Sequence, residues 1–262
     1  MDISTHLSPS HDRSLWLGGP LGQRVYTLER KLVAEALSQV FGWQLLQIGD
    51  WGGDLGLLAG ARTQRKAVLS EHAVHTPDNT MSIRSRLDAL AIASDSVDAV
   101  LLPHTLECAS DPHELLREVE RILPGDGQLV VLGFRPFSSW GLRNLLAQNG
   151  FPPGTERLIS EHRLRDWLKL LGFEVPYARR YLFSWPWGGT APRAQHFLEN
   201  AGGALWPLFA GAYLLRARKR VYTMTLITPR RRLRKQVVGG LLEPTTRVTT
   251  PFSTPGNHAT DD

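Results

Sequence analysis

Apolar residues in the first part of the chain change between the spacing of a helix and that of a buried strand. Between residues 22 and 41 they recur every three or four positions, which predicts an amphipathic helix that ends at Gly42. A short apolar run at 45–48 follows and ends in a glycine-rich turn at 49–53. This order predicts a strand, a tight turn and a short helix at 54–58, the beginning of a β-α-β unit.

The middle of the chain carries stronger signals. A weak strand is predicted at 66–69 and a strong, mostly apolar one at 97–102. Asp111 and Pro112 are residue types favoured at the N-cap and first position of a helix, and the turn at 124–127 ends that helix. The same signals predict the later elements: a strand at 128–133, a helix at 161–171, an extended segment at 173–175, a helix at 204–215 and a final strand at 221–227.

Strands that alternate with helices at this spacing predict an α/β fold, a doubly wound and mostly parallel sheet with helices on both faces. We divide the chain into an N-terminal extension at 1–20, one domain at 21–228 and a tail at 229–262. The tail is basic at first and then rich in Thr and Pro, so we expect it to be disordered.

Charge is unevenly distributed over the 262 residues, whose net charge is +5. Residues 200–242 hold nine Lys and Arg and no acid, which leaves 21 basic against 25 acidic residues in the rest. The basic stretch at 216–235 suits an anionic membrane surface or nucleic acid as partner, and its alternative is a solvated charge run.

Three features narrow the class of protein. No run reaches the ~18–20 consecutive apolar residues that span a bilayer, and the polar N-terminus is not a secretory signal, so we expect a cytoplasmic protein. Cys108 is the sole cysteine of the sequence, which excludes an intramolecular disulfide and a multi-thiolate zinc site. His72 and His75 have no third ligand at a metal spacing, so no metal site is predicted.

The segment 96–133 carries an ordered series of motifs. A strand, SVDAVLLPHTLE, is followed by Asp111-Pro112, by the helix LLREVERIL and by PGDGQLVV. This series resembles the fourth strand, the next helix and the fifth strand of the class I S-adenosylmethionine-dependent methyltransferases, most closely the type 11 group that includes the ubiquinone and menaquinone C-methyltransferases. The resemblance is strong over 96–133 and moderate over 45–133. It implies a Rossmann-like methyltransferase fold of seven strands, with the last strand antiparallel.

The resemblance also implies S-adenosylmethionine as cofactor and assigns residues to it. The family's first motif corresponds to 45–53, the ribose-binding acid to Ser70-Glu71 and the adenine-flanking segment to 86–88. The loop that starts at His104 would face the methyl group. The residues expected at the cofactor are therefore Gln47, Gly49, Trp51, Gly53, Glu71, Leu87, Asp88 and His104.

Three positions depart from the family's pattern. Gln47 and Arg86 stand where acids are expected, with Asp88 two residues after Arg86, and Trp51 replaces the middle glycine. A hydrogen bond to a charged acceptor contributes roughly 1.5–3 kcal/mol, so each lost acid weakens binding about tenfold to a hundredfold. Trp51 either rests its indole on the sulfonium, which is favourable by ~0.5–2 kcal/mol, or fills the cavity.

Methyl transfer from an activated carbon depends mainly on alignment and desolvation, and it needs a base only when the acceptor loses a proton. His104 is the first candidate for this base and Glu107 the second, and the alternative for His104 is a structural loop histidine. The aromatic stretch 181–187 and the predicted helix 204–215 either cover the acceptor site or pack in the core.

These observations favour an enzyme that transfers a methyl group from S-adenosylmethionine to a small or lipophilic acceptor. The first alternative is a catalytically inactive, methyltransferase-like binding module, which the changes at Gln47, Trp51 and Arg86 favour. The second is a nicotinamide-dependent oxidoreductase, whose fingerprint the turn at 49–53 fits badly.

Overall fold

A computed structural model describes residues 9–52, 56–72, 75–76, 80–147, 150–183, 186 and 210–220. The chain divides into two units, Met1–Tyr222 and Thr223–Asp262, and all of the described residues lie in the first unit. The predicted last strand at 221–227 and the predicted tail at 229–262 therefore lie outside the described residues.

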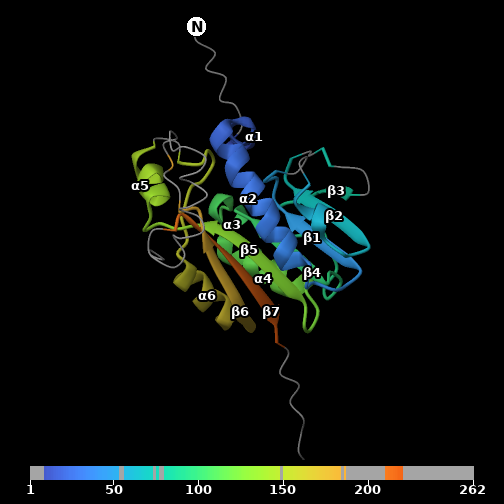
Figure 1. Ribbon diagram of the computed structural model, residues 1–262. Coiled ribbons are helices and arrows are strands. Elements are labelled where there is room, and N and C mark those ends of the chain that lie inside the picture. Colours follow the sequence, from blue (N-terminus) through green and yellow to red (C-terminus); the bar gives the residue numbers. More distant parts are fainter. Residues whose placement is uncertain are drawn as a thin grey trace, which may run out of the picture. The chain divides into compact units, whose positions relative to one another are not determined.

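A seven-stranded sheet forms the centre of the first unit (Figure 1). Its order is β3-β2-β1-β4-β5-β7-β6, with parallel pairing from β3 to β5 and antiparallel pairing of β7 with both β5 and β6. The strands are β1 (Gln44–Ile48), β2 (Arg65–Ser70), β3 (Thr80–Arg84), β4 (Ala99–Pro103), β5 (Gln128–Phe134), β6 (Phe173–Tyr181) and β7 (Ala212–Lys219). The structure confirms the predicted α/β class and the mostly parallel, seven-stranded sheet.

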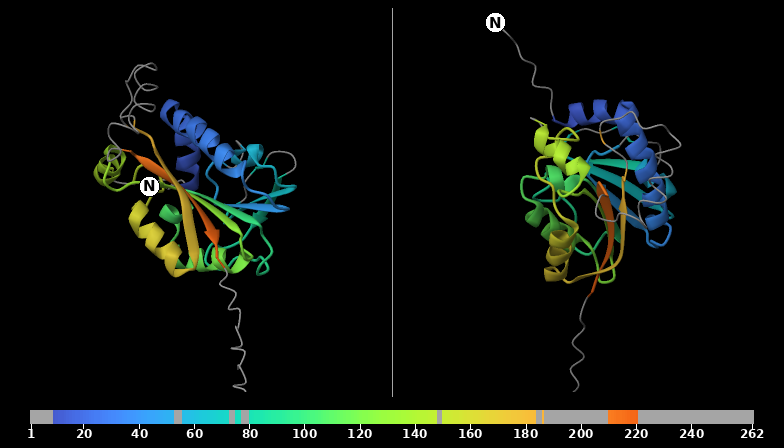
Figure 2. Two further views of the ribbon diagram at one scale, coloured as in Figure 1. Left: turned by 60° about the horizontal axis from the view of Figure 1, so that its bottom comes forward. Right: turned by 60° about the vertical axis from the view of Figure 1, so that its left-hand side comes forward.

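Helices cover both faces of this sheet (Figure 2). Side chains of α1 and α2 pack on one face, and those of α4 and α6 pack on the other, so the core has one apolar layer on each side of the strands. The helices are α1 (Pro9–Gly18), α2 (Pro20–Leu37), the 3-10 helix η2 (Leu57–Gly60), α3 (Thr105–Cys108), α4 (Pro112–Ile122), α5 (Ser139–Leu146) and α6 (Glu161–Leu170). None of the described helices combines the length and the apolarity needed to cross a bilayer.

Helix α4 shows how local sequence fixes an element beside the site. The Asp111 carboxylate accepts hydrogen bonds from the backbone N–H groups of His113 and Glu114, and Pro112 occupies the first turn. Four buried residues of this helix pack into one apolar layer: Leu115, Leu116, Val119 and Ile122. The helix predicted after Asp111 is therefore confirmed.

The structure corrects the prediction of a helix at 204–215. Residues 212–215 are the first half of β7, and 204–209 lie outside the described residues. Since β7 lies between β5 and β6, Ala212, Tyr213, Leu214 and Leu215 are all buried and show no alternation. Such an unbroken apolar run fits a buried strand and a buried helix equally well.

Four elements were not predicted from the sequence: α1, α3, α5 and β3. Helix α1 lies within the stretch that we treated as an extension, and it buries Leu17 beside the partly buried Trp16. Strand β3 is the edge strand of the sheet, and its residues are exposed or half-buried, so it lacks the apolar pattern of a buried strand.

Candidate functional site

A cleft of about 180 Å³ opens where β1, β2 and β4 end at one edge of the sheet. We call it the strand-tip cleft, and its lining includes Arg13, Gly49, Asp50, Glu71, Leu87 and Cys108. Open α/β sheets bind ligands at the carboxyl ends of their strands. The position of this cleft is therefore the one expected of a ligand site.

The turn after β1 reaches the cleft because of a close backbone approach. Gly49 has a φ of +105°, and a side chain there would place its Cβ 2.5 Å from Oγ1 of Thr105. The Thr105 hydroxyl in turn donates a hydrogen bond to the carbonyl of Ile48. This packing of the turn against α3 leaves room only for glycine at position 49.

Gln47 lies under this turn and not in the cleft. Its side chain is buried, and its Nε2 donates hydrogen bonds to the carbonyls of Gly49 at 3.1 Å and Trp51 at 3.3 Å. An acid at this position could not donate to those carbonyls. Gln47 therefore holds the turn in the conformation that carries Trp51 inward.

Five polar or aromatic residues form what we call the buried polar cluster: Glu29, Trp51, His104, Glu107 and Tyr181. All five residues are at most 2% exposed. The His104 ring lies between two carboxylates, with Nε2 2.8 Å from Glu29 Oε1 and Nδ1 3.1 Å from Glu107 Oε2. Trp51 Nε1 and the Tyr181 hydroxyl also donate to Glu29, at 2.8 and 3.0 Å.

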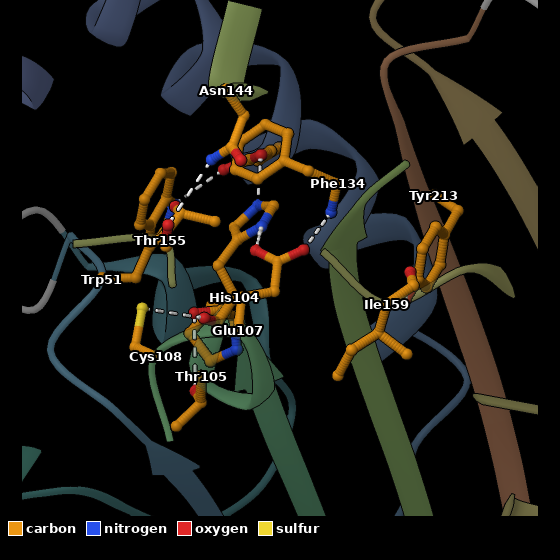
Figure 3. Close-up of polar contacts among 12 residues, drawn as sticks. Trp51, His104, Thr105, Glu107, Cys108, Phe134, Asn144, Thr155, Ile159 and Tyr213 are labelled. Carbon is orange, nitrogen blue, oxygen red and sulfur yellow. Dashed lines mark hydrogen bonds and ion pairs between the residues drawn. The ribbon is translucent and has the colours of Figure 1, made fainter. Parts of the chain in front are cut away.

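The second carboxylate of this cluster is held by the backbone. Figure 3 shows the Glu107 carboxylate between the His104 ring and the amide of Phe134, which donates a hydrogen bond to Oε1 of Glu107. The His104 ring also stacks on the Phe134 ring, with 4.1 Å between the ring centroids. Both ring nitrogens of His104 are therefore occupied, and its ring is enclosed.

The two carboxylates set the charge of the cluster. Burial lowers the pKa of His104, but the charges of Glu29 and Glu107 outweigh burial and raise this pKa to about 9. Burial raises the pKa of Glu107, against the opposing effect of the His104 charge. At neutral pH His104 is thus an imidazolium, which has no free lone pair to accept a proton.

We expect the stability of the protein to depend on His104 between about pH 6.5 and 9. Its pKa is higher in the folded state than the ordinary ~6.5, so its contribution is complete below pH 6.5 and is lost as the pH rises through 9. The difference between these two pKa values corresponds to roughly 3 kcal/mol of folding free energy. Urea unfolding between pH 6.5 and 9 measures this loss of stability. The variant His104→Asn should make the free energy of unfolding less dependent on pH. The surface variant His162→Gln is the control, and an equal slope in both variants would contradict the assignment.

Trp51 fills the interior beside the cleft. It is 1% exposed, and its ring packs 4.4 Å from the His104 ring and 5.9 Å from the Trp16 ring, measured between centroids. It does not line the strand-tip cleft. Of the two alternatives for this residue, this conformation shows the one in which the indole fills a cavity.

The other residues predicted at the cofactor divide into three groups. Gly49, Glu71 and Leu87 line the strand-tip cleft together. Asp88 pairs instead with the exposed Arg86, whose Nε lies 2.9 Å from Asp88 Oδ1, and this pairing lowers the pKa of Asp88. Gly53 lies outside the described residues.

Several residues at the site were missed from the sequence, among them two that lie on the N-terminal helices. Arg13 of α1 lines the cleft, where its Nη1 lies 3.2 Å from Asp50 Oδ1 and donates to Cys108 Sγ at 3.3 Å. Burial raises the pKa of Cys108 to about 12, so it is the neutral thiol. Glu29 was also missed, although an acid on the apolar face of a helix, among buried Val25 and Leu32, is a readable signal.

The basic stretch at 216–235 begins inside the fold. Arg218 pairs with Asp126 at 3.0 Å and Lys219 with Glu120 at 2.8 Å. Arg220 pairs with Glu174 at 2.7 Å. Their charges are thus balanced by acids of the same unit. Residues 221–235 lie outside the described residues, and within the described ones no group of three His, Cys, Asp or Glu could hold a metal ion.

Comparison with known proteins agrees with this fold. A family model of the methyltransferase domain matches residues 59–131. The uncharacterized protein YafS of Escherichia coli (strain K12) is 35% identical over 202 residues, which are 76% of this chain and 77% of YafS.

Solved structures share the fold at low sequence identity. An S-adenosylmethionine-dependent methyltransferase from Thermotoga maritima matches with a TM-score of 0.53 and 17% identity, over 81% of this chain and 100% of the other. Geranyl diphosphate C-methyltransferase from Streptomyces coelicolor, solved with S-adenosyl-L-homocysteine, matches with a TM-score of 0.53 and 13% identity, over 75% and 78%.

Proposed function

This chain belongs to the class I S-adenosylmethionine-dependent methyltransferases, in one family with YafS of Escherichia coli, and we propose that it transfers a methyl group from S-adenosylmethionine, bound in the strand-tip cleft, to a small or lipophilic acceptor. The observation that carries this proposal is that Gly49, Glu71 and Leu87, from three separate segments, line one cleft. The sequence resemblance assigns these residues to the cofactor, and the cleft lies where open α/β sheets bind ligands.

The residues of the cleft suit this cofactor. The Glu71 carboxylate can accept hydrogen bonds from the ribose hydroxyls, and Leu87 offers apolar surface to the purine ring. The cleft measures about 180 Å³, whereas sites for ligands of drug size measure ~300–1,000 Å³, so binding must widen it. The ion pair of Arg13 with Asp50 at its wall is a contact that can open.

S-adenosylmethionine supplies an electrophilic methyl carbon when it is bound. The chain's own residues then need to align two molecules and exclude water, since an in-line displacement asks little else of them. Both ring nitrogens of His104 face carboxylates, and the charges of Glu29 and Glu107 raise the pKa of His104 to about 9, so it can act as the predicted base only after losing a proton. An acceptor that loses no proton needs no base, and the proposal favours such an acceptor.

A lipophilic acceptor is supported by the region of α5. This helix and the loop before it expose four large apolar side chains: Phe137, Leu142, Leu145 and Leu146. Groups of exposed apolar side chains on a soluble fold often mark contact surfaces for apolar molecules. The region follows β5 directly in the sequence.

Isothermal titration with S-adenosylmethionine and with S-adenosylhomocysteine tests the proposal. We expect saturable heat with both ligands, and incubation with a lipid and metabolite extract should convert the first into the second. Absence of heat up to millimolar ligand would overturn the proposal. Mass spectrometry of the same incubation identifies the methylated acceptor by its added mass.

Glu71→Ala should weaken the binding of both ligands about tenfold to a hundredfold, because hydrogen bonds to a charged acceptor contribute ~1.5–3 kcal/mol. Glu71 is exposed at the end of β2, so the variant should keep its melting temperature. Glu114→Ala, which removes an exposed carboxylate of α4, is the matched control for titration and should bind like the wild type. Equal affinities of the two variants would place the ribose elsewhere.

The second candidate function is a methyltransferase-like binding module without catalysis. It is favoured by the His104 ring, whose two nitrogens are both engaged, and by Trp51, whose indole fills the interior. Under this alternative the protein binds S-adenosylmethionine but leaves it intact in the extract. The extract incubation therefore separates the two candidates.

A further inference from the structure

Arg13 is a buried cation with unused hydrogen-bonding capacity. The residue is 9% exposed, and its Nε has no hydrogen-bond partner among the described residues. Its Nη1 faces one strong acceptor, Asp50 Oδ1 at 3.2 Å, and one weak acceptor, the Cys108 thiol. A buried guanidinium with five donors is normally matched by more than this, and a carboxylate that accepts two parallel hydrogen bonds is its usual partner.

The charges around Arg13 describe the ligand that fits. Arg13 and Asp50 stand side by side at the wall of the strand-tip cleft, so one cation and one anion are presented together. A group that carries a carboxylate beside an ammonium complements both charges at once, because each side chain can exchange its present partner for the ligand. The free α-amino-acid group has this arrangement.

We infer that Arg13 binds the carboxylate of an α-amino-acid group and that Asp50 binds its ammonium. The inference rests on the proposed function, since S-adenosylmethionine carries such a group at the end opposite its adenine. It also fixes the direction of the ligand: the amino-acid end lies between α1 and the turn after β1, and the adenosine end lies towards Glu71 and Leu87. Arg13 is thus a positioning residue for the methyl donor.

Three adenosyl thioethers test this inference by titration calorimetry. S-adenosylhomocysteine carries the whole amino-acid group, its decarboxylated analogue S-adenosyl-3-thiopropylamine lacks the carboxylate, and 5′-methylthioadenosine lacks both charges. On the wild-type protein we expect the loss of the carboxylate to weaken binding about tenfold to a hundredfold. Equal binding of the first two ligands would overturn the inference, and this comparison needs no variant.

Arg13→Gln supplies the second comparison. This variant should weaken the binding of S-adenosylhomocysteine by the same factor and leave the affinity for 5′-methylthioadenosine unchanged. Arg13→Lys should recover part of the lost affinity because it keeps the charge. Arg24→Gln, an exposed arginine of α2, is the matched control. Equal weakening of the binding of both ligands by Arg13→Gln would show a structural role and overturn the inference.

If the wild type binds 5′-methylthioadenosine but gains no affinity from the amino-acid group, the inference fails and the proposed cleft stands. If it binds none of the three, the proposed function fails as well.

Discussion

Glu29→Ala is expected to destabilise the protein by about 3–5 kcal/mol, the range measured when one partner of a buried charge pair is removed. Glu29 is fully buried and accepts hydrogen bonds from His104, Trp51 and Tyr181. Its loss leaves three buried donors without their acceptor, one of them charged. The free energy of urea unfolding at pH 7 measures the effect.

Glu35→Ala is the matched control, since Glu35 lies on the same helix with its side chain 62% exposed and pairs with Arg179 on the surface. Exposed pairs contribute about 0–1 kcal/mol, so this variant should unfold almost like the wild type. Glu29→Gln keeps the shape of the side chain and removes its charge. The loss of unfolding free energy that it causes should be smaller in a protein that also carries His104→Asn, because that second change removes the buried imidazolium. Additive costs of the two changes would contradict a direct coupling.

The buried polar cluster explains how a tryptophan at position 51 can be buried. An indole in the interior needs an acceptor for its N–H, and Glu29 provides one at 2.8 Å. A buried Glu29 needs a cation, and His104 provides it, with Glu107 as a second carboxylate on the other ring nitrogen. The tryptophan that departs from the family's first motif is therefore part of a hydrogen-bonded group of residues that depend on one another.

Much of the sheet was predictable because its signals are local. The runs that became β1, β4 and β5 are short and apolar between turn residues, and the helix after Asp111 has its cap and its apolar face in the sequence. By contrast, β7 was mistaken for a helix over 212–215, since a strand buried on both sides shows no alternation.

The sequence indicated the candidate site only where a motif covers it. Gly49, Glu71 and Leu87 follow strands at the places that the resemblance assigns, and they do line the cleft. Arg13 and Glu29 lie on helices that the motifs do not cover, and they meet Cys108 and His104 across 95 and 75 residues of sequence. Contacts of this kind depend on tertiary packing, which a single sequence does not reveal.

Trp51→Ala is expected to destabilise the protein by about 3–5 kcal/mol, as large-to-small changes of buried aromatic residues do. The indole fills the space between the rings of Trp16, His104 and Phe134, and its removal leaves a cavity. It also leaves Glu29 Oε2 without its donor at 2.8 Å. Thermal and urea unfolding measure the loss, and Trp51→Phe should cost less because it fills most of the same volume.

Trp43→Ala provides the matched control, because Trp43 is 66% exposed just before β1 and its truncation opens no cavity. The same pair of variants decides what the indole does for the ligand. An indole that rests on the sulfonium would favour S-adenosylmethionine over S-adenosylhomocysteine, whose sulfur is uncharged, by ~0.5–2 kcal/mol. Since Trp51 does not line the cleft, we expect the ratio of the two affinities to be the same in Trp51→Ala as in the wild type. A fall in that ratio, at a temperature where the variant is folded, would show that the side chain leaves the interior when the methyl donor binds.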